Sequence, residues 1–497
     1  MEVQQEKRAY QQVFNATFIF GGVQVFNILI GLVRNKIVAV LLGSAGFGFM
    51  SLLNAPLGFV TYLTGLGIDF SAVRDISSAH ETGDQTKLST ILKTFRRWVW
   101  FTGLLGMLTV IVLSPWLSQW SFGNKDNTWA YLLISITLLI GAISGGQSAI
   151  LRGTRRIKDT AQVGVWGAAF GLLISLPLYY LYGIQGIVPA AIISALGVLF
   201  FSWYFSRKVE TVPVQISYKE SYRQGRPMVK LGMAQTVNLL IGSGISYLLI
   251  AFISNRGGLS EVGLYNAGWS ITNQYVGLVF AAMAVDFFPR LAGVYADNLK
   301  IKEMVNQQAE IAILLIAPIM LIYLISLPIL VPLLYTSKFL SIIPFTQWIV
   351  LGMLLKTAAW PLGFIPLAKG DTKFYLLLEG VIHNGLSLVT FVAGYYFFGL
   401  KGIGIAFLIM YILYFTLINI VGIKRYQVNY SRTFFKLLLF QLLLCLIAFL
   451  VAYFFKYPVG YISGGVLLII SSLYSYRELN KRIVLKELIQ SKIKRGN

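Results

Sequence analysis

The residues most able to do chemistry are cations that interrupt apolar stretches of the chain. Arg34 and Lys36 lie in the apolar run 31–43, and Lys356 lies in the middle of another. A charge within a membrane span costs at least about 2.5–3.5 kcal/mol, so such a side chain usually faces a polar cavity or a partner. Because the guanidinium of arginine makes paired hydrogen bonds to phosphate oxygens, these residues predict a membrane-embedded cavity that holds an anionic group.

Further cations stand near the expected inner ends of spans. Together with the buried ones, the candidate substrate-binding residues are Arg34, Arg74, Lys230, Arg290 and Lys356. A competing interpretation is that Arg74, Lys230 and Arg290 anchor helix ends on the cytoplasmic side. Lys356 has the alternative of pairing with a carbonyl or carboxylate for packing alone.

Three carboxylates and a histidine accompany these cations. Asp69, Asp286, Glu379 and His383 are candidates for pairing with the cations or for carrying a coupling proton. Glu379 and His383 stand four residues apart, which places them on one face of a helix and allows a mutual contact. A purely structural role of this pair is the alternative.

The composition excludes most soluble classes. Of 497 residues, 57% are hydrophobic and only 12% are charged, so the membrane domain is essentially the whole chain. One cysteine and two histidines are too few for a disulfide framework or a metal site. There is no Gly-Lys-Ser/Thr nucleotide motif. We therefore expect no metal, no cofactor, no catalytic residue and no enzyme activity.

The apolar runs predict an all-α polytopic membrane protein. About fourteen spans are expected, at 13–42, 47–73, 98–120, 129–150, 163–183, 186–205, 229–253, 263–288, 309–335, 341–368, 375–398, 402–422, 434–455 and 459–476. Of the 41 Lys and Arg residues, 33 then fall on one side, five on the other and three within spans. Since cytoplasmic loops collect Lys and Arg, both termini are expected in the cytoplasm. The net charge of +22 then needs no nucleic-acid partner.

Two short matches suggest an internal repeat. Gly48 at the start of the second span aligns with Gly263 at the start of the eighth, and Asp69–Arg74 aligns with Asp286–Arg290. The matched spans are six apart, an even number, so the repeats would be parallel, as in some transporters. The expected organisation is an N-terminal lobe 1–205, a cytoplasmic linker 206–228, a C-terminal lobe 229–422, two spans in 423–476 and a basic cytoplasmic tail 477–497.

These features resemble a known family. The segment RNKIVAVLLG, the turn GSAGFGFM and the sequence LGID followed by AVRD resemble the O-antigen translocases of the multidrug/oligosaccharidyl-lipid/polysaccharide exporter superfamily. The resemblance implies a flippase of the bacterial inner membrane that serves lipopolysaccharide biosynthesis. It would move undecaprenyl-pyrophosphate-linked O-antigen repeat units from the cytoplasmic to the periplasmic leaflet, by alternating access through a cationic central cavity.

The first span also resembles that of lipid II flippases. Arg34 takes the position of a cavity arginine there, whereas Lys36 stands where that family has alanine. A second arginine of that family has no counterpart, because residues 13–33 carry no charge. The resemblance therefore does not define the arrangement of cations in the cavity.

Two other functions compete with this one. A cation-coupled multidrug exporter of the same superfamily would hold its substrates with membrane-embedded acids, whereas the deepest charges here are cations. A membrane enzyme of polysaccharide assembly, a polymerase or ligase, would need a substantial outer loop, and every expected outer loop is short. The expected partners are the lipid-linked oligosaccharide, membrane lipids, the polymerase and other polysaccharide-assembly proteins.

Overall fold

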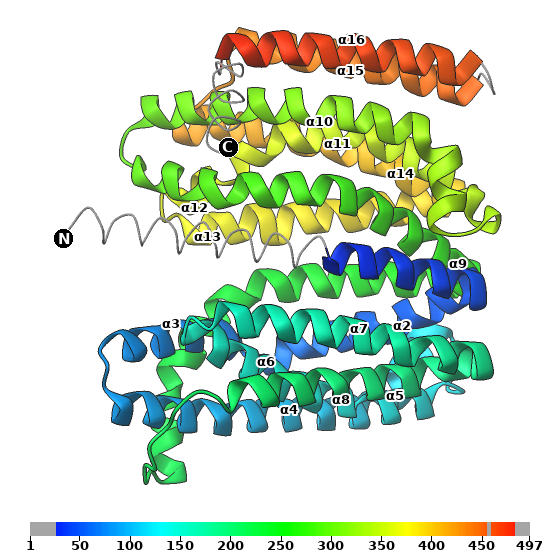
Figure 1. Cartoon of the computed structure of the whole chain (residues 1–497). Coiled ribbons are helices and arrows are strands. Elements are labelled where there is room, and N and C mark those ends of the chain that lie inside the picture. The colour runs from blue at the N-terminus through cyan, green and yellow to red at the C-terminus, as the bar shows by residue number, and fades with distance from the viewer. Residues whose placement is uncertain (1–25, 455–458, 483–497) are drawn as a thin grey trace, which may run out of the picture. The chain divides into compact units, whose positions relative to one another are not determined.

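A computed structural model of the chain describes residues 26–454 and 459–482, and in this part it contains helices and no strand (Figure 1). An apolar environment favours this structure, because backbone amides in hydrocarbon must be bonded within their own segment or in a closed barrel. Nine helical segments of the described residues are long and apolar enough to cross a membrane. The expected all-α polytopic membrane fold is confirmed.

Three of these segments are interrupted at a glycine. Positive φ angles of 56° at Gly183, 78° at Gly258 and 59° at Gly399 mark the turns, and this backbone conformation favours glycine. Each of the three segments therefore holds two of the expected spans. With the helix at 26–41 and the C-terminal helix, the described chain is consistent with fourteen spans.

The contacts divide the chain into two compact units, Met1–Gly263 and Leu264–Asn497. The first contains the helical residues 26–41 and then α2 (Gly43–Gly65), α3 (Ile68–Glu81), α4 (Gln85–Phe122), α5 (Thr128–Ile134), α6 (Ile136–Gly153), α7 (Ile157–Tyr182), η1 (Gly183–Gly186), α8 (Ile187–Ser206) and the first part of α9 (Tyr218–Gly293). The expected linker 206–228 thus includes the first turns of α9. Its irregular backbone covers 207–217.

The second unit begins within α9. It continues with α10 (Asn298–Leu334), η2 (Ser337–Ile342), α11 (Ile343–Gly363), α12 (Ile365–Ala368), α13 (Thr372–Tyr375), the π-helical η3 (Leu376–His383), α14 (Asn384–Tyr426), α15 (Arg432–Phe454) and α16 (Val459–Arg482). Two of the longest helices begin at aspartates that accept backbone hydrogen bonds. Asp84 accepts from Lys87 N at the start of α4, and Asp297 from Leu299 N and Lys300 N at the start of α10.

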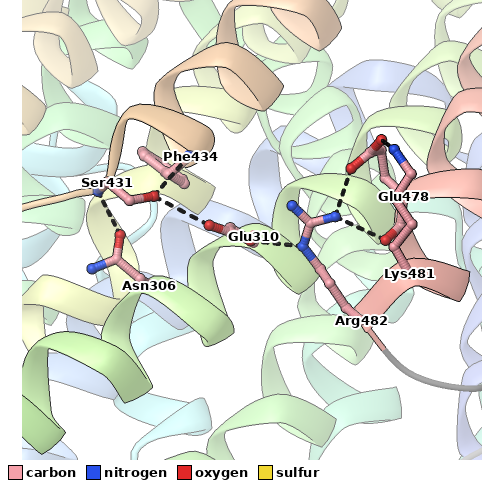
Figure 2. Close-up of polar contacts among 7 residues, drawn as sticks. All are labelled: Asn306, Glu310, Ser431, Phe434, Glu478, Lys481 and Arg482. Carbon is pink, nitrogen blue, oxygen red and sulfur yellow. Dashed lines mark hydrogen bonds and ion pairs between the residues drawn. The ribbon is translucent and has the colours of Figure 1, made fainter.

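A polar network fastens the C-terminal helices to α10 (Figure 2). Arg482 at the end of α16 donates from Nε to Glu310 Oε2 at 2.7 Å and from Nη1 to Glu478 Oε2 at 2.7 Å. Ser431 caps α15 through Phe434 N and also donates to Glu310 Oε1 at 3.2 Å. Glu310 therefore joins α10 to both α15 and α16.

Candidate functional site

The second unit encloses a polar cavity of about 270 Å³ between α11, η3 and α14. It brings together three residues predicted from the sequence, namely Lys356, Glu379 and His383. The remaining walls are Ala359, Trp360, Gly363, Phe364, Tyr375, Tyr411 and Tyr414. A lysine, a carboxyl group, an imidazole and three phenols thus face one small space lined by aromatic rings.

The π-helical η3 positions the carboxyl and imidazole groups. Tyr414 donates its hydroxyl hydrogen to Glu379 Oε1 at 2.5 Å, and His383 Nε2 lies 3.3 Å from the hydroxyl of Tyr411. Glu379 and His383 make no hydrogen bond to each other within the described structure. The expected mutual contact assumed α-helical spacing, whereas these residues lie in the wider turn of a π-helix. Each side chain instead contacts a tyrosine of α14.

Two neighbouring residues support this geometry. Asn384 Nδ2 donates to the carbonyl oxygens of Glu379 and Gly380, at 2.9 and 3.0 Å, which satisfies backbone acceptors within the π-helical turn. A β-carbon added at Gly363 would lie 2.6 Å from Glu379 Oε1. The absence of a side chain at Gly363 therefore allows the carboxyl group to approach α11.

Lys356 supplies the cation of this cavity. It is half-buried in α11, and its Nζ lies 5.7 Å from the ring centre of Phe280. Within the described part of the chain its ammonium group makes no hydrogen bond or ion pair. The packing alternative requires a carbonyl or carboxylate partner, and the described contacts include neither for this ammonium group. An aromatic face is a weak partner for a cation, which leaves the ammonium available to an anionic group.

The first unit holds a second polar cavity, of about 350 Å³, between α2, α3, α4 and α6. Asp69 lines it, two residues after the left-handed Gly67 that separates α2 from α3. Arg152 is the positive charge that acts on this carboxyl group. A β-carbon at Gly145 would lie 3.1 Å from Asp69 Oδ2, so the carboxyl group also depends on a small neighbour.

Threonines provide most of the other polar atoms of this cavity. They are Thr61, Thr64, Thr102 and Thr137, and each donates its hydroxyl hydrogen to a backbone carbonyl oxygen three or four residues earlier in the chain. The hydroxyl oxygens keep their acceptor capacity. The cavity therefore presents oxygen acceptors around a single carboxyl group.

The remaining predicted cations line neither of these two cavities. Arg34 and Lys230 are exposed on their helices. Arg74 is exposed and pairs with the neighbouring Asp75 at 2.8 Å, and Arg290 is exposed near the end of α9. The side chain of Asp286 lies outside the described structure. Of the predicted cations, the cavity of the second unit includes Lys356 alone.

Sequence reasoning missed the tyrosines. Tyr411 and Tyr414 are three residues apart in an apolar span and so share one face of a helix. This spacing is a signal of a polar site that carries no charge. Phenols in a span need a hydrogen-bond partner. Their spacing would have pointed to the polar cavity.

Comparison with solved structures identifies the fold. An inward-facing MATE family multidrug resistance transporter of the MOP superfamily matches with a TM-score of 0.68 and 16% identity, over 82% of this chain and 96% of that one. The lipid II flippase MurJ, in an inward closed conformation, matches with a TM-score of 0.67 and 13% identity, over 94% and 100%. The chain has the fold of these transporters, as the resemblance predicted.

Sequence comparison identifies the family. Residues 37–344 match the family described as Polysaccharide biosynthesis protein, and the chain belongs to it. The lipid III flippase of Escherichia coli (strain K12) is 24% identical over 363 residues, 70% of this chain and 83% of that protein, and the lipid III flippase of Shigella flexneri matches equally. These relatives are flippases and transporters, in agreement with the expectation of a protein that is not an enzyme.

Proposed function

We propose that this protein is a flippase for lipid-linked oligosaccharides in the bacterial inner membrane. The observation that carries the proposal is the similarity to lipid III flippases along 83% of their length, in a chain with the fold of membrane transporters. The finer proposal is that the substrate is an undecaprenyl-pyrophosphate-linked O-antigen repeat unit. It would move from the cytoplasmic to the periplasmic leaflet, with both termini of the protein in the cytoplasm and the polymerase receiving the product.

The chemistry of such a substrate suits the residues found. A diphosphate carries its negative charge through about 30 Å of hydrocarbon only along a hydrated path with matching cations. Lys356 supports this role because its ammonium lies in a cavity with polar side chains, and no carboxylate of the described residues is bonded to it. We propose that the diphosphate meets the other predicted cations elsewhere along the path, namely Arg34, Arg74, Lys230 and Arg290. A few separate cations favour release as well as binding.

The acids are proposed to serve coupling. Glu379 and Asp69 each line a polar cavity, and a carboxyl group in such a place can take up and release a proton as the cavity opens to either side. Asp286 and His383 are the further candidates. The same acids favour the second candidate function, a cation-coupled multidrug exporter, because acids in a cavity also attract cationic drugs.

Deletion of the gene separates the two functions. A flippase mutant should lose surface polysaccharide and accumulate the lipid-linked repeat unit in the inner leaflet, where an added membrane-impermeant lectin does not reach it. Intact polysaccharide with a new sensitivity to cationic drugs would instead support the exporter.

Substitution of Lys356 then tests the cavity. Lys356→Met keeps the apolar stem but removes the charge, and we expect at least a tenfold loss of flipping, equivalent to about 1.4 kcal/mol, with partial recovery in Lys356→Arg. Lys338→Met is the matched control, because Lys338 is an exposed lysine of η2. Normal export by Lys356→Met would remove this residue from the mechanism.

A further inference from the structure

A basic hollow lies beside α4 in the first unit, apart from both cavities described above. Its volume is about 850 Å³, and Lys93, Arg96 and Arg97 line it together with residues 211–215 and Tyr218. Its lining includes no carboxylate. Three cations in a lining that holds no carboxylate produce a positive potential that favours an anionic ligand.

Two of these cations are held in place by the irregular segment 207–217 and the start of α9. Lys93 Nζ donates to Val214 O at 2.6 Å, and Arg97 Nη1 donates to Ser217 O at 2.9 Å and to Ser221 Oγ at 2.6 Å. The Arg97 guanidinium also lies 4.1 Å from the ring centre of Tyr218. None of these partners carries a negative charge, so both cations keep their net positive charge.

Arg96 is the third cation, and it is exposed. Within the described structure its guanidinium makes no hydrogen bond or ion pair. A planar group with five free donors is suited to the paired oxygens of a phosphate. The hollow therefore contains two preorganised cations beside one that is ready to bind.

The position of Arg96 along α4 places the hollow at the depth of lipid head groups. Residues 98–124 carry no charge, and Trp100 and Trp116 are 51% and 53% exposed. Exposed tryptophans are typical of membrane interfaces. From Arg96 to Trp116 the helix rises about 30 Å at 1.5 Å per residue, which is the thickness of the hydrocarbon core.

An exposed apolar stripe begins at the hollow and continues along the same helix. Its members are Trp100, Phe101, Leu104, Leu108 and Val112, spaced so that they follow one face of α4. A ligand with an anionic head and apolar chains would meet the cations with its head and the stripe with its chains. A free phosphate would use only the cations.

We propose that this hollow binds the phosphate of an anionic glycerophospholipid from the leaflet on the side of the positively charged loops. Arg96 makes the paired hydrogen bonds, and Lys93 and Arg97 add positive charge. The bound lipid would fill the space between α4 and residues 211–218, and so would stabilise the contact between them. This site does not depend on the proposed transport function.

Native mass spectrometry of the full chain in detergent tests the proposal. Dioleoyl phosphatidylglycerol should bind more tightly than dioleoyl phosphatidylcholine, and Arg96→Gln should weaken phosphatidylglycerol binding about fivefold, the factor for about 1 kcal/mol per basic residue at an anionic surface. Arg96→Lys should retain part of the affinity. Arg226→Gln and Lys87→Gln are controls, because these exposed cations do not line the hollow.

Three results would overturn the proposal. Equal binding of the two lipids would exclude recognition of the anionic head group. Equal binding of phosphatidylglycerol by the parent protein and Arg96→Gln would exclude this hollow as the site. Glycerol phosphate that displaces phosphatidylglycerol at equal concentration would show that the acyl chains contribute nothing, and that the hollow binds a free phosphate.

Discussion

Gly48 and Gly263 lie at a helix crossing where each meets the backbone that precedes the other. A β-carbon added at Gly48 would lie 1.8 Å from Leu259 O, and one added at Gly263 would lie 1.8 Å from Ser44 O. Each contacted residue stands four positions before the opposite glycine. Reciprocal contacts of this kind arise between segments related by a two-fold axis. They join the two glycines that the sequence alignment of the predicted repeat had paired.

The crossing predicts a loss of stability when either glycine gains a side chain. A methyl group at position 48 or 263 has no rotamer to relieve its contact with backbone, so Gly48→Ala and Gly263→Ala should each destabilise the protein by about 1–3 kcal/mol. Thermal unfolding in detergent measures the effect. Gly277→Ala, also in α9, meets nothing within 4 Å and should not destabilise. Equal melting temperatures for all three variants would contradict the close crossing.

The same crossing offers a cross-link. Ser44 Oγ and Ser260 Oγ lie 2.5 Å apart, and the one native cysteine, Cys445, is buried. In Ser44→Cys/Ser260→Cys we expect a disulfide on oxidation. If alternating access separates these helix ends, the oxidised protein should not flip lipid-linked oligosaccharide and should recover on reduction. Transport at the full rate with the link intact would exclude such a movement, and Ser44→Cys alone is the control.

The attachment of α16 predicts a second effect on stability. The side chains of Arg482 and Glu310 are only 20% and 13% exposed, so Arg482→Met leaves two carboxylates without their guanidinium partner. We expect a loss of about 1–3 kcal/mol and faster proteolysis at the end of α16. Arg477→Met, at an exposed position of the same helix, should leave melting temperature and cleavage unchanged. A similar result for both variants would mean that the network contributes little.

Acid should weaken one contact between connecting segments. The Arg425 guanidinium donates to Asp371 Oδ2 at 2.7 and 3.0 Å, and this hydrogen bonding, with Tyr426 adding to it, holds the pKa of Asp371 below its usual value. A carboxyl group with a lower pKa in the folded state stabilises above its unfolded pKa of about 3.9. That stabilisation is lost as the pH falls through the folded pKa.

We therefore expect Asp371→Asn to melt at a less pH-dependent temperature between about pH 5 and 3 than the parent protein. The same variant should be the less stable of the two at neutral pH. Asp126→Asn changes an exposed aspartate and should follow the parent curve. An unchanged pH dependence in Asp371→Asn would exclude this carboxyl group as the source.

The sequence was sufficient for the membrane fold and for part of the cavity. The length of each apolar run can be read from the sequence, and the thickness of the bilayer determines how many residues a span needs. The spans can therefore be predicted from local composition. Lys356, Glu379 and His383 stood out because charged groups are rare in such runs. Their common cavity could not be predicted, because it depends on how α11 and α14 pack.

Other features depend on the path of the backbone. The expected contact between Glu379 and His383 assumed an α-helix, whereas residues 376–383 form a π-helix. No periodicity in an apolar segment distinguishes the two. The basic hollow escaped prediction for a related reason, since Lys93 and Val214 are brought together by folding across 121 positions of sequence.

The cavity of the second unit depends on the number of residues in the π-helical η3 as well as on their types. A π-helix accommodates an extra residue in a helix, and removal of one residue from 376–383 would let an ordinary α-helix form. The helices on either side would stay close to their present register, because the wide turn had absorbed the extra residue, whereas the side chains within 376–383 would move to other positions around the helix axis. Every side chain of the cavity would still be encoded, yet Glu379 and Tyr414 would no longer meet, so a relative that is one residue shorter here should have a different cavity.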